Sequence, residues 1–172
     1  GNYAFMSCDG LTSITIPKSV TSIGGNVFNG CTALTEVLLE GGSTLTSENF
    51  GEVANKVVIR WNEDNLTWTL TADGTMTISG TGPMKSYDDN LEGRRPYNSP
   101  VFNNSEIKKV VIEDGVTSIG EFAFRDCSSL TSIEIPSSVT SIGNFAFYNC
   151  TGLTSISIPK SVTSIGTYTF SG

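Results

Sequence analysis

The apolar positions between Cys127 and Phe170 follow one pattern twice, and the copies begin at Cys127 and at Cys150. Each copy contains a cysteine, a leucine, two isoleucines separated by one polar residue, a proline, a valine, an isoleucine–glycine pair and a phenylalanine. Serine and threonine fill most positions between them. A fixed period of about 23 residues is typical of a solenoid, in which each unit buries its apolar face only against its neighbours.

Each repeat predicts short strands. The isoleucines on either side of Glu134 alternate with polar residues, as in a half-buried strand, and Pro136 ends this strand because proline cannot donate to a ladder. We expect a second extended piece at residues 139–142, a sharp bend with positive φ at Gly143 and a single helical or 3₁₀ turn at residues 145–147. Serine and threonine suit the solvated face of a sheet better than a helix. We therefore expect a mostly β repeat solenoid.

The same pattern begins the chain. Residues 8–28 form a complete unit, and a second unit starts at Cys31 but loses the proline, the isoleucine–glycine pair and one residue after Glu40. Residues 57–61 predict a last strand of this worn repeat. The chain begins and ends within a unit, so we expect a fragment of a longer array, for which a missing signal peptide carries no information about export.

The period is absent between the two arrays. Residues 66–71 and 75–79 alternate on either side of Asp73-Gly74, which predicts a β-hairpin with one apolar face. We expect this hairpin to act as a cap on the open end of a solenoid, and residues 80–104 to form a long irregular loop. The predicted domains are repeats at 1–61, the β-hairpin cap and loop at 62–105, and repeats at 106–172.

The pattern Cys-x-x-Leu-x-x-Ile-x-Ile-Pro-x-x-Val-x-x-Ile-Gly-x-x-Ala-Phe resembles the BspA-like class of leucine-rich repeats found in bacterial surface proteins. The segment 68–82 is similar to the capping unit that often precedes these repeats in that family. The resemblance implies a right-handed leucine-rich-repeat superhelix with short helical turns. It also implies an extracellular location, at the cell surface or secreted, and adhesion to a host extracellular-matrix or cell-surface protein.

Composition narrows the possible functions. Seventeen acidic and ten basic residues give a net charge of −7, which argues against a nucleic-acid partner because phosphate binding needs a basic surface. No apolar run is long enough to span a membrane. The sequence has no histidine and no close cysteine pair, so we expect no metal site and no Ser-His or Cys-His nucleophile. No cofactor is expected.

Four cysteines lie at equivalent positions of the repeats, Cys8, Cys31, Cys127 and Cys150. They allow two interpretations: two disulfides between neighbouring units, or a ladder of small, buried, reduced thiols. The ladder is favoured by the common direction of stacked side chains, which makes the disulfide torsion hard to reach.

One acidic cluster carries the only catalytic candidate. Asp88, Asp89 and Glu92 provide carboxylates for a hydrolase or for weak calcium binding, and the alternative is a solvated acidic turn. Nothing near them in the sequence would bury them, so we expect no enzymatic activity.

The candidate binding residues form two repeated surfaces. The first consists of outward strand positions, which are Ser13, Thr15, Glu36, Leu38, Lys109, Val111, Ser132, Glu134, Ser155 and Ser157. The second is an aromatic row made of Tyr3, Phe122, Phe145 and Tyr168. These rings offer a platform for a sugar or a partner protein, or else they stack on one another and complete the edge of the core.

The hypothesis that these observations favour is a non-enzymatic extracellular binding or adhesion module that uses the solenoid face for a protein–protein or cell-surface interaction. The alternative is a carbohydrate-binding or spacer module of a larger secreted enzyme, with a glycan as partner. A hydrolase using Asp88, Asp89 and Glu92 is the third hypothesis.

Overall fold

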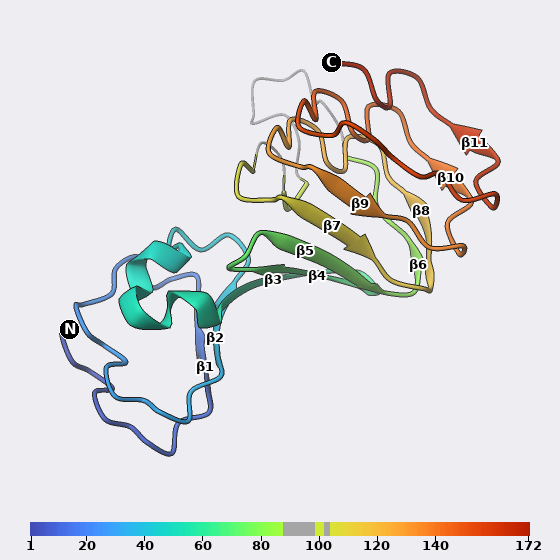
Figure 1. The fold of residues 1–172 in the computed structure, drawn as a ribbon. Helices are drawn as coiled ribbons and strands as arrows, with labels where there is room; N and C mark the ends of the chain where they lie inside the picture. The colour runs from blue at the N-terminus through green and yellow to red at the C-terminus, as the bar shows by residue number, and fades with distance from the viewer. Residues whose placement is uncertain (88–98, 102–103) are drawn as a thin grey trace. The chain divides into compact units, whose positions relative to one another are not determined.

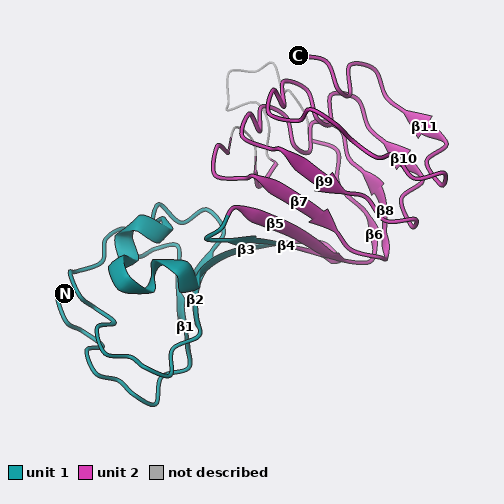
Figure 2. Cartoon of the chain, in the orientation of Figure 1, with its two compact units in different colours: residues 1–61, 69–73 teal, residues 62–68, 74–172 magenta. Residues whose placement is uncertain are grey.

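The computed structural model describes residues 1–87, 99–101 and 104–172 (Figure 1). These residues form two compact units, which Figure 2 colours separately. Unit 1 contains residues 1–61 and 69–73, and unit 2 contains residues 62–68 and 74–172. Each unit holds a stack of repeats, and one turn of a stack is called a rung.

Unit 1 is built on three parallel strands, β1 (Ser13–Ile16), β2 (Glu36–Glu40) and the first part of β3 (Val57–Glu63). β1 pairs with β2 so that Ile14 lies beside Val37, its equivalent in the next repeat. The buried core of unit 1 consists of Ile16, Val27, Phe28, Cys31, Leu34, Val37, Leu39, Leu45, Phe50, Val53 and Val57. Each fully buried side chain of this kind contributes about 1.5–3 kcal/mol, which a single rung could not collect alone.

The worn repeat of unit 1 contains a 3₁₀ helix, η1 (Ser47–Lys56), that the sequence pattern did not predict. Its Phe50 and Val53 are buried, and Phe50 stacks on Phe28 with ring centroids 6.2 Å apart. Gly51 interrupts the helix with φ 56°. The predicted loss of one residue is confirmed, because the two stacked phenylalanines are one position closer in the sequence than a full period. The predicted last strand is β3.

Unit 2 has two ladders of strands, as Figure 1 shows, in which every pairing outside the hairpin is parallel. The first follows the order β4 (Leu66–Thr71, of which Leu66–Trp68 belong to this unit), β5 (Thr75–Gly80), β7 (Lys109–Ile112) and β9 (Ser132–Glu134). The second follows β6 (Gly82–Pro83), β8 (Val116–Ile119), β10 (Ser141–Ile142) and β11 (Ser164–Ile165). A mostly β solenoid is therefore confirmed, with both predicted extended pieces of a repeat in separate ladders.

Equivalent residues lie on neighbouring rungs. Val110 pairs with Ile133, and Ile142 pairs with both Ile119 and Ile165. Threonine reinforces this stacking, since the Thr140 hydroxyl donates to the Thr117 carbonyl one rung earlier at 3.2 Å, and Thr163 does the same to Thr140. A threonine in these columns thus adds an inter-rung hydrogen bond to its preference for sheets.

One predicted strand is absent: residues 154–158 form no strand. In the other rungs of unit 2 this part of the repeat is β7 or β9. The first ladder therefore ends at β9, whereas the second continues one rung further, to β11. Ser155 and Ser157 are exposed on this irregular segment.

The bend after each second strand differs from the prediction. Gly143 does not have a positive φ. Its lack of a side chain is required by close approach, because a Cβ there would lie 2.6 Å from the Glu121 nitrogen of the previous rung. The positive φ falls two residues later, on Phe145 (53°). The segment 145–147 is a hydrogen-bonded turn, in which the Tyr148 N–H donates to the Phe145 carbonyl at 3.1 Å.

The predicted hairpin strands are β4 and β5, and their apolar face is buried. Trp68 is fully buried and packs on Tyr87 and Phe124 with centroid separations of 6.4 and 5.5 Å. β5 also continues the ladder, because it pairs in parallel with β7. The hairpin therefore supplies a strand of the stack in addition to covering apolar surface.

The rung that contains β5 is longer than the others. Thr75 pairs with Lys109, which follows it by well over one period, and the Tyr87 N–H donates to the Glu121 carbonyl at the same spacing. After residue 98 the regular spacing returns, since the Cys127 thiol donates to the Val101 carbonyl, 26 residues earlier, as the Cys150 thiol does to Phe124. The additional residues therefore fall between Tyr87 and Ser99. The sequence pattern predicted one irregular loop over residues 80–104 and did not reveal the return of the repeat spacing within them.

Candidate functional site

The outward strand positions of unit 1 form a small mixed surface. Ser13 and Thr15 are exposed on β1, and the Cα partners of these two residues are Glu36 and Leu38 on β2. Leu38 lies beside Val58 of β3, and both are half-buried. The Glu36 carboxylate is 3.7 Å from the Arg60 guanidinium. We call residues 13, 15, 36, 38, 58 and 60 the sheet face of unit 1.

The corresponding surface of unit 2 lies on β5, β7 and β9. Lys109 is the Cα partner of Thr75 and Ser132, and Val111 is the partner of Thr77 and Glu134. The Lys109 ammonium lies 2.6 Å from the Glu134 carboxylate, and both side chains are at least partly exposed. A solvated pair of this kind contributes at most about 1 kcal/mol, so it fixes side-chain positions more than it stabilises the fold. We call residues 75, 77, 109, 111, 132 and 134 the sheet face of unit 2.

Two predicted sheet-face residues do not join this surface. Ser155 and Ser157 are exposed, but the segment that carries them forms no strand. They are therefore not held in the ladder that orders Lys109, Ser132 and Glu134.

The aromatic row is continuous in unit 2. Phe145 stacks on Phe122 with centroids 5.0 Å apart and planes at 4°, and on Tyr168 at 5.2 Å and 27°. The rings lie face to face, so each ring covers the inner face of its neighbour, and mainly ring edges are left for a ligand. Exposure rises along the row, from 8% for Phe122 to 60% for Tyr168. The stacking interpretation therefore describes the packing of the row, and its role in binding stays a prediction.

All members of the row adopt a left-handed backbone conformation. Phe122, Phe145 and Tyr168 have φ of 57°, 53° and 54°. Bulky residues rarely adopt this region, and each costs of order 1–3 kcal/mol unless its surroundings compensate. The ring contacts along the row offset part of this cost.

Tyr3 belongs to unit 1, where the next rung has no aromatic residue at the equivalent position. The next rung of unit 1 places Asn26 at the equivalent position, also with positive φ (52°). Tyr3 is 55% exposed. Asparagine tolerates this conformation better than an aromatic residue, so unit 1 keeps the turn without the stack.

Sequence reasoning missed two side chains beside the row. The Arg125 guanidinium carbon lies 5.6 Å from the Phe122 ring centroid and 5.1 Å from that of Tyr148. The Tyr148 ring meets Phe145 edge-on at 5.6 Å. Arg125 also pairs with Asp126, with Nε 3.4 Å from the carboxylate. The signal was present in the sequence, because Arg125 and Tyr148 are themselves one period apart.

The four cysteines are free thiols. In unit 1 the Cys31 thiol donates to the Phe5 carbonyl at 3.0 Å, and in unit 2 the Cys150 thiol donates to the Phe124 carbonyl at 3.1 Å. Burial raises the pKa of the Cys127 thiol well above its usual value of 9.0, and burial raises that of Cys150 to about 12. The ladder interpretation therefore describes this structure, and the thiols are poor nucleophiles because the thiolate is disfavoured.

One further polar contact is partly buried. The Tyr87 hydroxyl donates a hydrogen bond to the Glu63 carboxylate. Burial, followed by this hydrogen bond and the charge of Glu63, raises the pKa of Tyr87 above its usual 10.0. Nearby, Lys85 pairs with Asp64 at 3.3 Å. These contacts hold the residues just before β4 in place within unit 2 and form no reactive site.

The sequence matches the BspA type leucine-rich repeat region family in six copies, over residues 1–63 and 97–172. The chain belongs to this family. A leucine-rich repeat protein from Eubacterium ventriosum is 36% identical, with a TM-score of 0.58. That similarity covers 66% of this chain but only 29% of the other one, so the present chain spans less than a third of its solved relative.

Two further structures are more distant. A leucine-rich cell surface protein from Faecalibacterium prausnitzii is 22% identical over 95% of this chain and 52% of its own, with a TM-score of 0.43. The pneumococcal vaccine antigen PcpA is 26% identical over 91% of this chain and 35% of its own, with a TM-score of 0.41. The comparison with curated proteins found no match.

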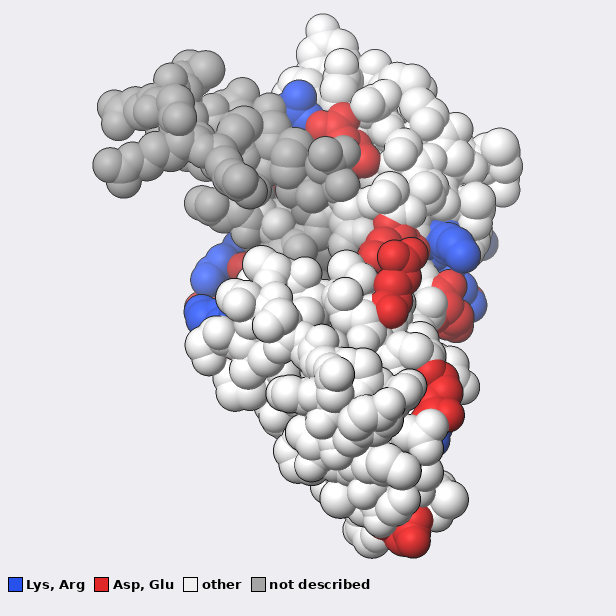
Figure 3. All heavy atoms as spheres, turned by 90° about the vertical axis from the view of Figure 1, so that its left-hand side faces the viewer, with Lys and Arg blue, Asp and Glu red and all other residues white. Residues whose placement is uncertain are grey.

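Charged side chains form only small groups on the leucine-rich repeats. On the face shown in Figure 3, acidic and basic side chains form small separate groups among uncharged residues. Within the described residues, no three histidine, cysteine, aspartate or glutamate side chains gather closely enough to hold a metal ion. None of the helices in the described part of the chain combines the length and apolar character that a bilayer crossing requires. Asp88, Asp89 and Glu92 lie outside the described residues.

Proposed function

We propose that this chain is a non-enzymatic binding module of a bacterial surface or secreted protein, and that the sheet faces of its leucine-rich repeats contact a protein on a host cell or in the extracellular matrix. Membership of the BspA type family supports the extracellular setting. The observation that carries the proposal is the sheet face of unit 2, where six outward side chains are held in register by two parallel pairings.

The composition of the sheet faces suits a protein partner. Leu38 and Val58 in unit 1, and Val111 in unit 2, supply apolar contact area. The ion pairs Glu36–Arg60 and Lys109–Glu134 border them. Protein interfaces combine an apolar centre with a polar rim in this way, and a rigid backbone reduces the entropy lost on binding.

A carbohydrate partner stays a prediction that the ring packing does not favour. Sugars stack on the faces of aromatic rings, and here Phe145 has Phe122 on one side and Tyr168 on the other. A sugar would therefore meet mainly the edges of Phe122 and Phe145, and Tyr168 is the one ring of the row that is largely exposed.

The experiment measures retention of the chain on host cells and on surfaces coated with matrix proteins. We expect Leu38→Lys and Val111→Lys to lower retention, because each places a long charged side chain at the apolar centre of a sheet face. Ser137→Lys is the matched control: it adds the same charge at an exposed position of unit 2, and the equivalent residue of the next rung is already Lys160. Equal retention of all three variants and the original chain would contradict the proposal.

A further inference from the structure

Three asparagines of the chain begin an Asn-x-Ser or Asn-x-Thr triplet, the sequence that N-linked glycosylation requires of its acceptor. The triplets start at Asn65, Asn103 and Asn149. Asn103 lies outside the described residues, whereas the other two triplets are described completely. The motif alone does not make a site, because the transferase also needs an exposed asparagine whose side-chain amide is free to react. The structure separates Asn65 from Asn149 on this point.

The side chain of Asn149 is already engaged in the stack. Its Nδ2 donates a hydrogen bond to the Asp126 carboxylate on the previous rung at 2.9 Å. Hydrogen bonds to an ionised carboxylate are shorter and stronger than those between neutral groups. Asn149 would have to give up this bond to enter the site of a transferase. The structure therefore argues against modification at Asn149.

Asn65 occupies an exposed turn of unit 2. Together with Asp64 it joins β3 to β4, and Asp64 has the left-handed φ of 52° that tight hairpin turns need. The Asp64 carboxylate pairs with Lys85 at 3.3 Å, whereas the Asn65 side chain makes no hydrogen bond to the described residues. The Asn65 carbonyl accepts from the Thr81 N–H at 3.3 Å. The backbone of the turn is thus fixed while the Asn65 amide stays uncommitted.

The third residue of this triplet is accessible as well. Thr67 is half-buried on β4, at a position that alternates with the buried Leu66 and Trp68. Its hydroxyl donates to the Asn62 side-chain oxygen at 3.2 Å, and this contact is exposed to solvent. Water competes for an exposed hydrogen bond, so the Thr67 hydroxyl can exchange this partner for a group of the transferase.

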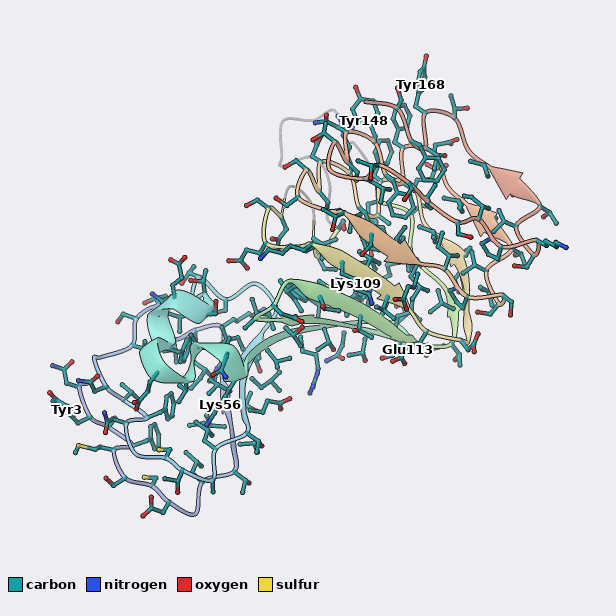
Figure 4. The ribbon with its side chains drawn as sticks, viewed as in Figure 1. Tyr3, Lys56, Lys109, Glu113, Tyr148 and Tyr168 are labelled. Atoms are coloured by element: carbon teal, nitrogen blue, oxygen red, sulfur yellow. The ribbon has the colours of Figure 1, made fainter. Side chains whose placement is uncertain are left out.

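The turn lies at one end of the sheet of unit 2. Thr81, which bonds to Asn65, follows the last residue of β5, and the Glu113 N–H donates to the Ile78 carbonyl of the same strand at 2.9 Å. Figure 4 labels Glu113 beyond the end of β7 and Lys109 on that strand. The attachment point is therefore at the Glu113 end, outside the six residues of the sheet face of unit 2.

We propose that Asn65 carries an N-linked glycan in the exported protein. This inference rests on the surface or secreted setting of the proposed function. The donor is an oligosaccharide joined to a lipid through a diphosphate. The Asn65 Nδ2 forms a bond to the anomeric carbon of the first sugar, and the bond from that carbon to the diphosphate oxygen breaks. The lipid diphosphate leaves with the electron pair, and Nδ2 loses one proton.

The test is mass spectrometry of the protein recovered from the surface or the medium of the cells that make it. Trypsin cleaves after Arg60 and Lys85 and at no residue between them, so Asn65 lies in the peptide 61–85, apart from the other two triplets. We expect this peptide to carry a sugar, and fragmentation that retains the sugar should place it on Asn65. The proposal is overturned by an unmodified peptide 61–85, by a sugar on a threonine of this peptide, or by a sugar on Asn149 alone.

Two substitutions of Thr67 separate the triplet from its surroundings. Thr67→Val keeps the shape of the side chain without the hydroxyl and should abolish the modification, whereas Thr67→Ser restores the hydroxyl and should retain it. Circular dichroism and urea unfolding show that both variants fold. A sugar that persists on Asn65 in Thr67→Val would also overturn the proposal.

The outcome is independent of the retention experiment. Absence of a sugar on Asn65, while Leu38→Lys and Val111→Lys still reduce retention on host surfaces, would remove the glycan alone and leave the proposed function standing. A sugar on Asn65 with equal retention of all variants would do the reverse.

Discussion

Replacing Gly143 by alanine tests the most specific packing claim, which is that neighbouring rungs touch backbone to backbone. A Cβ at this position would lie 2.6 Å from the Glu121 nitrogen and 2.8 Å from the Gly120 carbonyl carbon. Neither atom belongs to a flexible side chain, so the two rungs must move apart. The torsion angles of Gly143 are open to alanine, which removes backbone strain as an explanation.

The cost follows from the contacts near the clash. The Gly143 N–H donates to the Ile119 carbonyl at 2.9 Å, and the Phe122 N–H donates to the Asn144 carbonyl at 3.0 Å. Overpacking in a closely packed site costs about 1–3 kcal/mol. Weakening these two hydrogen bonds adds up to about 0.5–1.5 kcal/mol each. We therefore expect Gly143→Ala to lower the free energy of unfolding of unit 2 by about 2–4 kcal/mol.

The assay is urea unfolding followed by tryptophan fluorescence in a Trp61→Phe background. Trp68 is then the only tryptophan, and it is fully buried in unit 2. Gly25→Ala is the control, since a Cβ there meets nothing within 4 Å, and circular dichroism should show no loss of stability. A Gly143→Ala chain within about 0.5 kcal/mol of the original would refute the proposed backbone contact.

Three further changes test the stack. Phe147→Ala removes a ring that lies 5.2 Å from Phe124 and 5.5 Å from Phe170, and it should cost about 3–5 kcal/mol in the same assay; a loss below about 1 kcal/mol would contradict its place in the core. Thr140→Val keeps the shape but removes the hydrogen bond to the Thr117 carbonyl, so it should cost about 0.5–1.5 kcal/mol, whereas Thr140→Ser should cost less. The Cys150 pKa of about 12 exceeds the 9.0 expected in the unfolded chain, so between these pH values the folded chain holds more protons than the unfolded chain. The free energy of unfolding should therefore be unaffected below pH 9 and fall as the pH rises toward 12. It should fall less steeply in Cys150→Ala, and urea midpoints measured at each pH would show this difference.

The regular rungs could be predicted because their apolar spacing and their contacts have the same period. Alternation around Glu134 gave β9, and the segment ending at Ile142 gave β10. The reason why the repeat needs a glycine at position 143 could not be predicted. The pattern does not distinguish a glycine needed for its torsion angles from one needed for the close approach of another backbone segment. Only the position of the Glu121 backbone on the previous rung decides between them.

The candidate site shows the same limit. Outward strand residues such as Lys109 and Glu134 follow from alternation, and the structure joins them in an ion pair. Arg125 and Tyr148 were missed because they differ in chemistry although they share a position of the repeat. A search for repeated residue types overlooks a place where the type changes.

The long rung of unit 2 shows how a protein of this kind can acquire new sequence. The strands on both sides of residues 88–98 keep the same partners as in a rung of ordinary length, because the pairings that set their alignment are formed by residues outside that interval. Lengthening the chain there changes the spacing along the sequence but not the order of the ladder. The boundary between Tyr87 and Ser99 is therefore a natural acceptor point for a foreign peptide, such as an epitope or an affinity tag, in an engineered version of this array.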